Sequence, residues 1–259
     1  MVAILELDQG NTRCKWRLLV PEAEGESRVA GRGVLAAEFW LGNDDFPSCW
    51  VESGVNRIRI ANVAGAEREK QMAARLSGAL GVAPEFARVT PHCYGVTCAY
   101  PEPQRLGVDR WLAVLAAYRR DPGPSLVVDC GSAVTLDLLG EGGAHLGGYI
   151  VPGLGLMRRS LYRDTDAVKV SPALVPRMPL SPGRDTAAAV NRGLPLMVLG
   201  AIERAYAELW NVCRDSPAPH IWLTGGDSAF LSTLSPLSDR FAHCVVDDLV
   251  LEGLALTNP

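Results

Sequence analysis

Two segments of the chain carry an acidic residue, a glycine and hydroxyl or amide side chains directly after an apolar run typical of a β-strand. The first runs from Asp8 to Lys15, and the second begins at Asp129. Glycine permits a tight turn, the exposed N–H groups and polar side chains donate hydrogen bonds to phosphate, and the acid can hold a metal ion or its water. Two such hairpins facing each other would bind a nucleoside triphosphate.

Each segment taken alone also fits an ordinary hairpin, because Asn and Gly tolerate positive φ in tight turns. The second copy, and Lys15 at a distance from which it can reach a phosphate, favour the phosphate-binding interpretation. The chain contains neither G-x-x-x-x-G-K-[ST] nor a G-x-G-x-x-G after a strand. We therefore expect neither a Walker loop nor a Rossmann dinucleotide site.

A third chemical segment runs from Tyr100 to Arg110. Gly107 opens a predicted helix, and Asp109 and Arg110 lie in its first turn. A carboxylate beside a guanidinium suits a small acidic substrate whose hydroxyl must lose a proton. An acid in the first turn of a helix is also stabilised by the helix dipole with no catalytic role. Taken alone, the pattern leaves both interpretations of Asp109 open.

Two glycine-rich segments have weaker signals. Gly147–Gly153 lies between a predicted strand and a predicted helix. Leu223–Asp227 follows a strand and would let the backbone approach a flat ligand such as adenosine. The four histidines are scattered, with no pair at helical spacing and no adjacent nucleophile. We interpret them as structural or surface residues.

Strands lead and helices follow in both halves of the chain, which predicts an α/β fold. The spacing of apolar residues predicts strands at Arg57–Ala64, Ala144–Ile150 and His220–Leu223 and helices at Glu67–Leu80 and Val108–Arg119. It also predicts a loop at Thr90–Arg105. A long helical region is expected from Asp185 to Cys213, interrupted near Pro195.

The clearest break in the chain is Asp121-Pro-Gly-Pro, immediately before the second hairpin. With 259 residues, 48% of them hydrophobic, the chain can bury one large core or two ordinary ones. The duplicated hairpin favours two. We expect domains at residues 1–120 and 121–259.

Composition argues against several partners. The net charge is −4 and there is no long basic run, so no nucleic-acid binding is expected. No stretch reaches the ~20 apolar residues that span a bilayer, and the first residues lead into a strand without the features of a signal peptide. The seven cysteines include no C-x-x-C pair and are expected to be reduced thiols. We predict a cytoplasmic protein that is not bound to a membrane.

In order and spacing, these segments resemble the type III pantothenate kinases, which belong to the acetate and sugar kinase, heat-shock chaperone and actin superfamily. The resemblance covers nearly the whole chain. Its most specific motif is Y-x-x-P-x-x-L-G-x-D-R at Tyr100–Arg110, and it includes D-x-G-N-T-x-x-K at Asp8–Lys15. The remaining motifs are D-x-G-[TS]-A-x-T at Asp129–Thr135, G-G-x-I-x-P-G at Gly147–Gly153 and T-G-G at Thr224–Gly226. Ser132 stands where the family usually has threonine, so a hydroxyl is kept.

The resemblance implies two ribonuclease-H-like domains of the actin-like ATPase type, with the active site in the cleft between them. It implies ATP-dependent phosphorylation of pantothenate to 4'-phosphopantothenate, the first step of coenzyme A synthesis, with Asp109 as the proton acceptor. The implied ATP-binding residues are Asp8, Gln9, Gly10, Asn11, Thr12, Arg13, Cys14, Lys15 and Ser132. The implied pantothenate-binding residues are Tyr100, Gly107, Val108, Asp109, Arg110 and Thr186.

The resemblance also implies ions and a partner. Asp8 would lie near Mg²⁺, and Asp129 would be a ligand of a monovalent cation, K⁺ or NH₄⁺. The Gly147–Gly153 segment is similar to the dimer-interface motif of the family, so a homodimer is expected.

Two other functions are considered as alternatives. A sugar kinase of the same superfamily would carry different acceptor-site residues, and the Tyr100–Arg110 pattern argues against it. A non-catalytic ATP-binding accessory or regulatory protein would be favoured by loss of Asp109 or Lys15, and both are present. A coupled ADP-release assay separates these functions from pantothenate phosphorylation.

Overall fold

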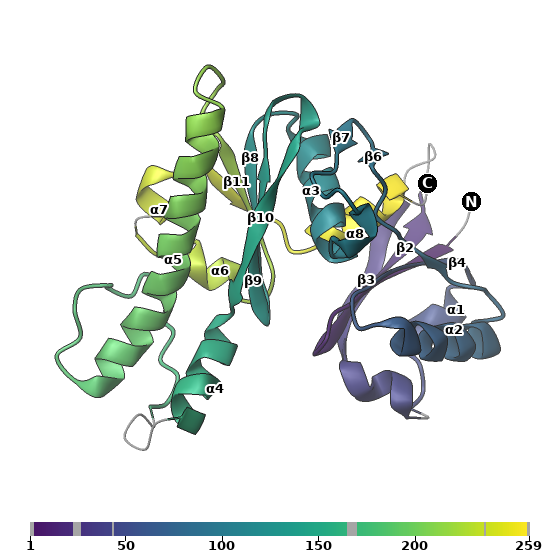
Figure 1. Ribbon diagram of the computed structural model, residues 1–259. Coiled ribbons are helices and arrows are strands. Elements are labelled where there is room, and N and C mark those ends of the chain that lie inside the picture. The colour runs from purple at the N-terminus through teal and green to yellow at the C-terminus, as the bar shows by residue number, and fades with distance from the viewer. Residues whose placement is uncertain (1–2, 23–26, 43, 165–169, 236, 258–259) are drawn as a thin grey trace. The chain divides into compact units, whose positions relative to one another are not determined.

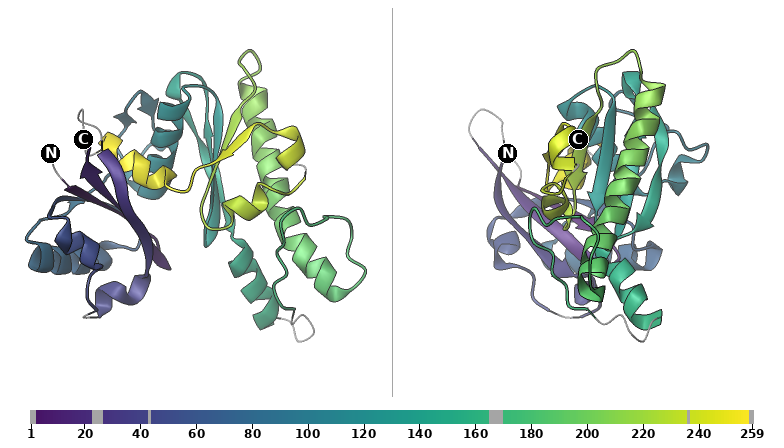
Figure 2. Two further views of the ribbon diagram at one scale, coloured as in Figure 1. Left: turned by 180° about the vertical axis from the view of Figure 1, so that it is seen from behind. Right: turned by 90° about the vertical axis from the view of Figure 1, so that its left-hand side faces the viewer.

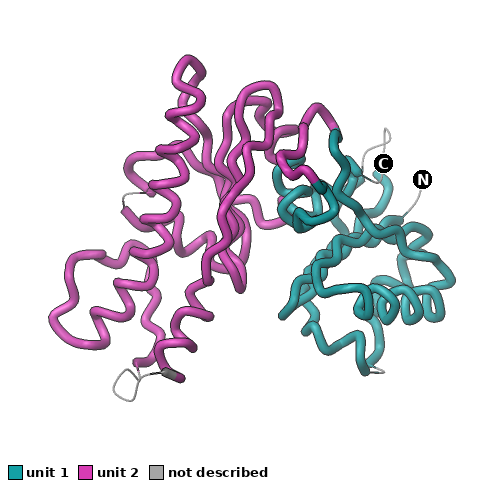
Figure 3. The backbone as a smooth tube through the Cα atoms, in the orientation of Figure 1, with its two compact units in different colours: residues 1–93, 102–116, 250–259 teal, residues 94–101, 117–249 magenta. Residues whose placement is uncertain are grey.

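The computed structural model describes residues 3–22, 27–42, 44–164, 170–235 and 237–257. The chain forms two compact units, which Figure 3 shows in different colours. Unit 1 comprises Met1–Cys93, Glu102–Ala116 and Val250–Pro259, and unit 2 comprises Tyr94–Pro101 and Ala117–Leu249. The division into domains at residues 1–120 and 121–259 stays a prediction.

Unit 1 is built on a five-stranded sheet in the order β3-β2-β1-β4-β5 (Figure 1). β1 is antiparallel to β2, which is antiparallel to β3, whereas β1–β4 and β4–β5 are parallel. The strands are β1 Ala3–Gln9, β2 Arg13–Pro21, β3 Ser27–Ala36, β4 Val55–Asn62 and β5 Glu85–Phe86. The first predicted hairpin is thus β1–β2, and the predicted strand at Arg57–Ala64 is β4, shifted by two residues.

Unit 2 repeats this arrangement with a sheet in the order β10-β9-β8-β11-β12. β8–β9 and β9–β10 are antiparallel, and β8–β11 and β11–β12 are parallel. The strands are β8 Ser125–Cys130, β9 Ala133–Leu139, β10 His145–Pro152, β11 His220–Thr224 and β12 His243–Val245. Order and direction match those of unit 1 strand for strand. The α/β class is confirmed, and the two hairpins occupy equivalent places in two sheets of one topology.

One face of the unit 1 sheet packs into an aromatic-rich core. Leu5 and Leu7 of β1 and Ile58 and Ile60 of β4 are fully buried there with residues of the helices that follow β3 and β4. Those helices are the 3₁₀ helix η2 Ala37–Leu41, α1 Ser48–Glu52 and α2 Ala66–Leu80. The core also holds Trp16, Trp40, Trp50, Met72 and Leu76. The alternation of a strand places the intervening residues of β1 on the opposite face.

That opposite face carries a buried ion-pair cluster. Glu6 lies beside Arg17 on β2 and Arg59 on β4. Arg17 Nε donates to Glu6 Oε2 at 2.5 Å, and Arg59 Nη1 donates to Glu6 Oε1 at 3.2 Å. Glu6 has no exposed surface and the arginines are 8% and 6% exposed, so the carboxylate depends on these two cations for its charge compensation.

The last helix of the chain belongs largely to unit 1. α8 spans Leu249–Thr257, and α3 spans Val108–Arg120, of which the part through Ala116 lies in unit 1. A Cβ added to Gly253 of α8 would lie 2.3 Å from the carbonyl oxygen of Leu112 in α3. The two helices therefore pack backbone against backbone, and a side chain at residue 253 would separate them.

In unit 2 the long helix α5, Thr186–Val212, packs on β8 and β9 and runs along the sheet (Figure 1, Figure 2). Leu194, Val198, Leu199, Ile202 and Leu209 of α5 are buried in the core of unit 2. The other helices of this unit are α4 Leu154–Asp164, α6 Ser228–Leu231 and α7 Leu237–Arg240. Short 3₁₀ helices lie at Pro103–Arg105 (η3, unit 1) and Glu141–Gly143 (η4, unit 2).

The expected interruption near Pro195 is wrong. α5 is continuous through Pro195, which is buried within it. Proline removes one helical hydrogen bond, to the carbonyl four residues earlier. Burial of apolar side chains on both sides of Pro195 offsets that loss, because Leu194 and Val198 pack into the same core.

The other predicted elements differ less from those of the structure. The predicted loop at Thr90–Arg105 contains η3 and two two-residue strands, β6 His92–Cys93 and β7 Val96–Thr97. The helix expected at Val108–Arg119 is α3, and the one expected at Glu67–Leu80 is α2. Among the described residues, no helix is both long and apolar enough to cross a lipid bilayer.

The buried ion-pair cluster yields a stability prediction with a matched control. Glu6→Ala leaves two buried guanidiniums without their carboxylate and should lower the free energy of unfolding by about 3–5 kcal/mol. Glu85 pairs with Arg57 on the same sheet at 2.8 Å, but the two side chains are 40% and 27% exposed. Glu85→Ala should therefore cost at most about 1 kcal/mol.

Urea unfolding followed by tryptophan fluorescence measures both free energies. Equal and small losses for Glu6→Ala and Glu85→Ala would contradict the role given to the buried cluster.

Candidate active site

The tip of the first hairpin is closed by the backbone. Gly10 N–H donates to Arg13 O at 3.0 Å, and the exposed residues between them turn the chain from β1 into β2. Asp8 lies directly opposite Lys15 in the strand register. Opposite residues on antiparallel strands share a face. One carboxylate and one ammonium therefore lie together beside the turn, as binding of a metal–phosphate group requires.

The side chains of two other residues of this hairpin lie on the face opposite to Asp8 and Lys15. Gln9 and Cys14 have no exposed surface. Gln9 Oε1 accepts a hydrogen bond from Trp40 Nε1 at 2.6 Å, which ties the turn to η2. Burial, with the negative charge of Asp8 adding to it, raises the pKa of the Cys14 thiol far above its usual range. Only the main chain of these two residues can face a nucleotide.

The start of α3 holds the predicted acceptor-site residues of unit 1. Asp109 Oδ1 accepts a hydrogen bond from Arg110 N–H at 2.7 Å, and Gly107 O accepts one from Trp111 N–H at 3.1 Å. A Cβ at Gly107 would lie 2.6 Å from Asp109 Oδ1. Glycine at residue 107 therefore leaves room for the carboxylate. Asp109 is partly exposed, whereas Val108 and Arg110 are buried.

The second hairpin is closed in the same way as the first. Gly131 N–H donates to Ala133 O at 3.0 Å, and Asp129 lies opposite Thr135. Ser132 is exposed at the tip. A carboxylate and two hydroxyl side chains thus lie at or beside the turn.

Two glycine segments from elsewhere in unit 2 pack against this tip. Gly153 N–H donates to Ser132 O at 3.1 Å, and a Cβ at Gly153 would lie 2.3 Å from Gly131 O. Gly225 has φ +91°, and a Cβ there would lie 2.4 Å from Asp129 Oδ1. The segments predicted separately at Gly147–Gly153 and Thr224–Gly226 therefore meet at one place.

Asp227, the last residue of the Leu223–Asp227 segment, had no role of its own predicted from the sequence. Its N–H donates to Cys130 O at 3.0 Å and so ties the loop after β11 to the end of β8. Burial, followed by the charges of Asp129 and Asp227, raises the pKa of the Cys130 thiol far above its usual range. Its position directly after the T-G-G motif was the only available signal.

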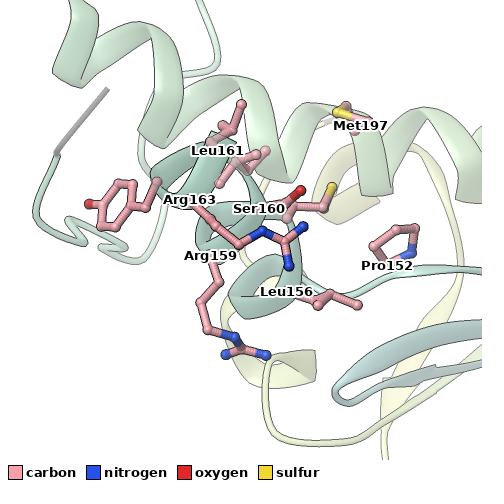
Figure 4. Close-up of a pocket in the computed structure, with 10 residues that line it drawn as sticks. Pro152, Leu156, Arg159, Ser160, Leu161, Arg163 and Met197 are labelled. Carbon is pink, nitrogen blue, oxygen red and sulfur yellow. The ribbon is translucent and has the colours of Figure 1, made fainter. Parts of the chain in front are cut away.

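Thr186 begins α5. Asp185 caps the helix by accepting a hydrogen bond from Ala188 N–H at 2.7 Å. Thr186 lines a pocket of about 740 Å³, which adjoins a pocket of about 940 Å³ between α4 and α5. The two share Leu161, Leu194 and Met197. Figure 4 shows the larger pocket with Arg159 and Arg163 among its lining residues.

The predicted site residues are divided between the units. Unit 1 contains the first hairpin and Gly107–Arg110, and unit 2 contains Tyr100, Asp129, Ser132 and Thr186. Within each unit the structure places an acid at the end of the first strand, beside a glycine turn. Groups of three or more His, Cys, Asp or Glu that could hold a metal ion are absent among the described residues.

Comparison with known proteins identifies the family. The family model described as "Type III pantothenate kinase" matches residues 4–208. The chain belongs to this family. A type III pantothenate kinase of Chromohalobacter salexigens is 41% identical over 257 residues, covering 99% of this chain and 87% of that protein. The family resemblance drawn from the motifs is confirmed.

Solved structures agree on the fold. A Campylobacter jejuni protein assigned to the Baf family of transcriptional activators gives a TM-score of 0.57 at 21% identity, over 97% of this chain and 95% of that one. A Sinorhizobium meliloti protein assigned as a 2-dehydro-3-deoxygalactonokinase gives 0.54 at 15% identity, over 97% of each chain. The expected α/β fold class, with two five-stranded sheets of one topology, is confirmed.

Proposed function

We propose that the protein transfers the γ-phosphoryl group of ATP to the primary hydroxyl of pantothenate, giving 4'-phosphopantothenate, the first step of coenzyme A synthesis. The observation that carries the proposal is the match to the type III pantothenate kinase family over residues 4–208. The 41% identity to the Chromohalobacter salexigens protein extends over 99% of this chain. The paired glycine hairpins supply the phosphate-binding chemistry that this reaction needs.

ATP is held by the two hairpins in this proposal. In the first, Asn11–Arg13 offer main-chain N–H groups, and Gly10 closes the turn that presents them. Lys15 offers a cation, and Asp8 fits Mg²⁺, which one or two carboxylates and substrate phosphates usually bind. Gln9 and Cys14 contribute main chain only, because their side chains are buried. In the second, the exposed Ser132 hydroxyl contacts phosphate.

Asp129 fits a monovalent cation. Its carboxylate is a hard oxygen ligand, and Gly225 approaches it so closely that a Cβ would lie 2.4 Å from Oδ1. Residue 225 has no side chain, so none competes with an ion for this carboxylate. K⁺ or NH₄⁺ bound there would supply positive charge near the phosphates.

Pantothenate is held at residues of the Tyr100–Arg110 motif and at Thr186. Arg110 supplies a guanidinium for the pantothenate carboxylate, and Tyr100, Gly107, Val108 and Thr186 complete its contacts. Asp109 orients the hydroxyl and accepts its proton. Phosphoryl transfer passes through a loose transition state, so the proton leaves late and a weak base suffices. Asp109, held at the start of α3 by Arg110 N–H, meets that need.

The free thiols and the co-substrate indicate the cellular compartment of the reaction. All seven cysteines carry free thiols, which is typical of proteins in reducing compartments. ATP as co-substrate points to the same place. We therefore place the reaction in the cytoplasm.

A coupled ADP-release assay tests the proposal. Purified protein with ATP and Mg²⁺ should release ADP only when pantothenate is added, and mass spectrometry should show the phosphorylated product. Turnover on hexoses without turnover on pantothenate would establish the sugar kinase instead. ATP binding without turnover on either substrate would establish the accessory protein.

The role of Asp109 separates catalysis from helix stabilisation. If Asp109 accepts the proton of the hydroxyl, Asp109→Asn should lower kcat by about 10²–10⁴-fold while ATP still binds. Glu67 offers a matched control, because it is an exposed acid in the first turn of α2 in the same unit. Glu67→Gln should lose only a few tenths of a kcal/mol of stability and keep wild-type kcat. Steady-state kinetics of both variants decide the point, and an Asp109→Asn variant with wild-type kcat would refute the assignment.

Salt dependence tests Asp129. Activity should be low in sodium or Tris buffer and rise with potassium or ammonium, because the proposed site lacks its cation otherwise. Asp129→Ala should remove this response. Asp215, an exposed acid of the same unit, gives the control, and Asp215→Ala should respond as the wild type does. Equal rates in all four salts would refute a cation site at Asp129.

A homodimer is proposed on the surface of α4 and α5. Leu156 and Met197 line the pocket of Figure 4 and are 44% and 62% exposed, an apolar surface of the kind that binds a partner. Two-fold dimers are the commonest soluble assemblies. The Gly147–Gly153 segment leads directly into α4, consistent with its interface role in the family.

Light scattering at micromolar concentration should give twice the chain mass of 27.8 kDa. Met197→Asp should give the monomer, because it places a charge in the apolar surface. Val212→Asp changes an equally exposed residue, 67%, at the far end of α5 and should leave the dimer intact. A wild-type mass of 27.8 kDa would contradict the dimer.

A further inference from the structure

The segment that carries Tyr100 is attached to the β9–β10 connection of unit 2. Thr97 forms a parallel bridge with Ala144. Gly143 has φ +75°, and a Cβ there would lie 2.1 Å from Gly95 O. Residue 143 must therefore be glycine for the segment to lie where it does. These contacts fix the segment before it reaches Tyr100.

The final attachment is made by His145. Ala99 N–H donates to His145 Nδ1 at 3.4 Å, and the imidazole faces the ring of Tyr100, with centroids 6.4 Å apart and planes 12° from parallel. The His145 side chain has no exposed surface. The residue next to Tyr100 in the chain and the ring of Tyr100 itself thus contact one buried imidazole.

Asp137 fixes the tautomer of that imidazole. His145 Nε2 lies 3.0 Å from Asp137 Oδ1, and the carboxylate side chain is only 2% exposed. Nδ1 can accept from Ala99 N–H only when it carries no proton. The proton of the neutral ring then lies on Nε2, where it donates to Asp137. A carboxylate on one nitrogen sets what the other nitrogen can do.

We propose that the Asp137–His145 pair positions Tyr100 for binding of the acceptor substrate. The inference rests on the proposed function, in which Tyr100 contacts pantothenate. His145 touches neither substrate in this account and acts through Ala99 and Tyr100. It is a positioning residue, and Asp137 sets its tautomer.

Two substitutions at residue 145 separate positioning from simple stability. The side-chain oxygen of asparagine takes the place of Nδ1, so His145→Asn keeps an acceptor for Ala99 N–H but withdraws the donor from Asp137. The amide nitrogen of glutamine takes the place of Nε2, so His145→Gln keeps a donor for the buried carboxylate but loses the acceptor for Ala99. His145→Asn should therefore unfold at the lower urea concentration.

Binding of pantothenate should be weakened in the opposite order, more in His145→Gln than in His145→Asn. His145→Gln should raise the KM for pantothenate about tenfold or more, with kcat and the KM for ATP within about twofold of wild type. His145→Asn should keep the KM for pantothenate within about threefold. Without substrate, amide hydrogen exchange across residues 94–101 should be faster in His145→Gln than in His145→Asn.

The inference is overturned if the KM for pantothenate follows the order of stability, or if His145→Gln keeps wild-type KM and exchange. It is also overturned if Tyr100→Ala leaves the KM for pantothenate unchanged. Failure of the proposed function has a different signature, because the wild type would then not phosphorylate pantothenate at all. The exchange measurement needs no turnover and reports the His145 contact in either case.

Discussion

At the tip of the β8–β9 hairpin, three stretches of backbone lie so close together that two of them have no room for a Cβ. Gly153 lies against Gly131 and Ser132, and Gly225 lies against Asp129 and Cys130. The arrangement of unit 2 around its predicted site depends on this crowding. These backbone contacts connect the end of β8 to the starts of α4 and α6, so the orientation of Asp129 is set by segments far along the chain. A methyl group at Gly153 would displace main chain, and one at Gly225 would displace both the Asp129 carboxylate and the main chain of Cys130.

The two sheets share a topology but compensate a buried acidic residue in different ways. The position opposite Glu6 on β1 is Arg17 on β2, and the equivalent position opposite Val127 on β8 is Asp137 on β9. In unit 1 the charge is balanced within the sheet, by arginines on both neighbouring strands. In unit 2 the acid is directed to His145 and, through it, to the loop that carries Tyr100. Equivalent positions therefore serve the stability of the sheet in unit 1 and, in our proposal, the positioning of Tyr100 in unit 2.

Local sequence signals predicted the hairpins well, because a glycine turn between two alternating runs depends on neighbouring residues alone. The same signals failed at Pro195, where the helix is maintained by burial in a core assembled from distant strands. The family resemblance implied ATP contacts at Gln9 and Cys14 without separating side chain from main chain, and the alternation of the strand turns both side chains away from Asp8. Asp227 and the Asp137–His145 pair left no periodic signal, because their partners are distant in the sequence or lie in the irregular loop at residues 94–101. Only the folded chain brings them together.

The contact between Gly253 and Leu112 has a consequence for biosynthesis. Unit 1 contains the first residues of the chain and also residues 250–259, whereas the residues of unit 2 end at Leu249. A ribosome makes the chain from the N-terminus, and nascent domains commonly fold in that order. Here the unit that begins first is completed last, because the α8 residues from Val250 onward follow every residue of unit 2 in the chain. We expect the nascent chain to finish unit 2 while the sheet of unit 1 still lacks its last helix.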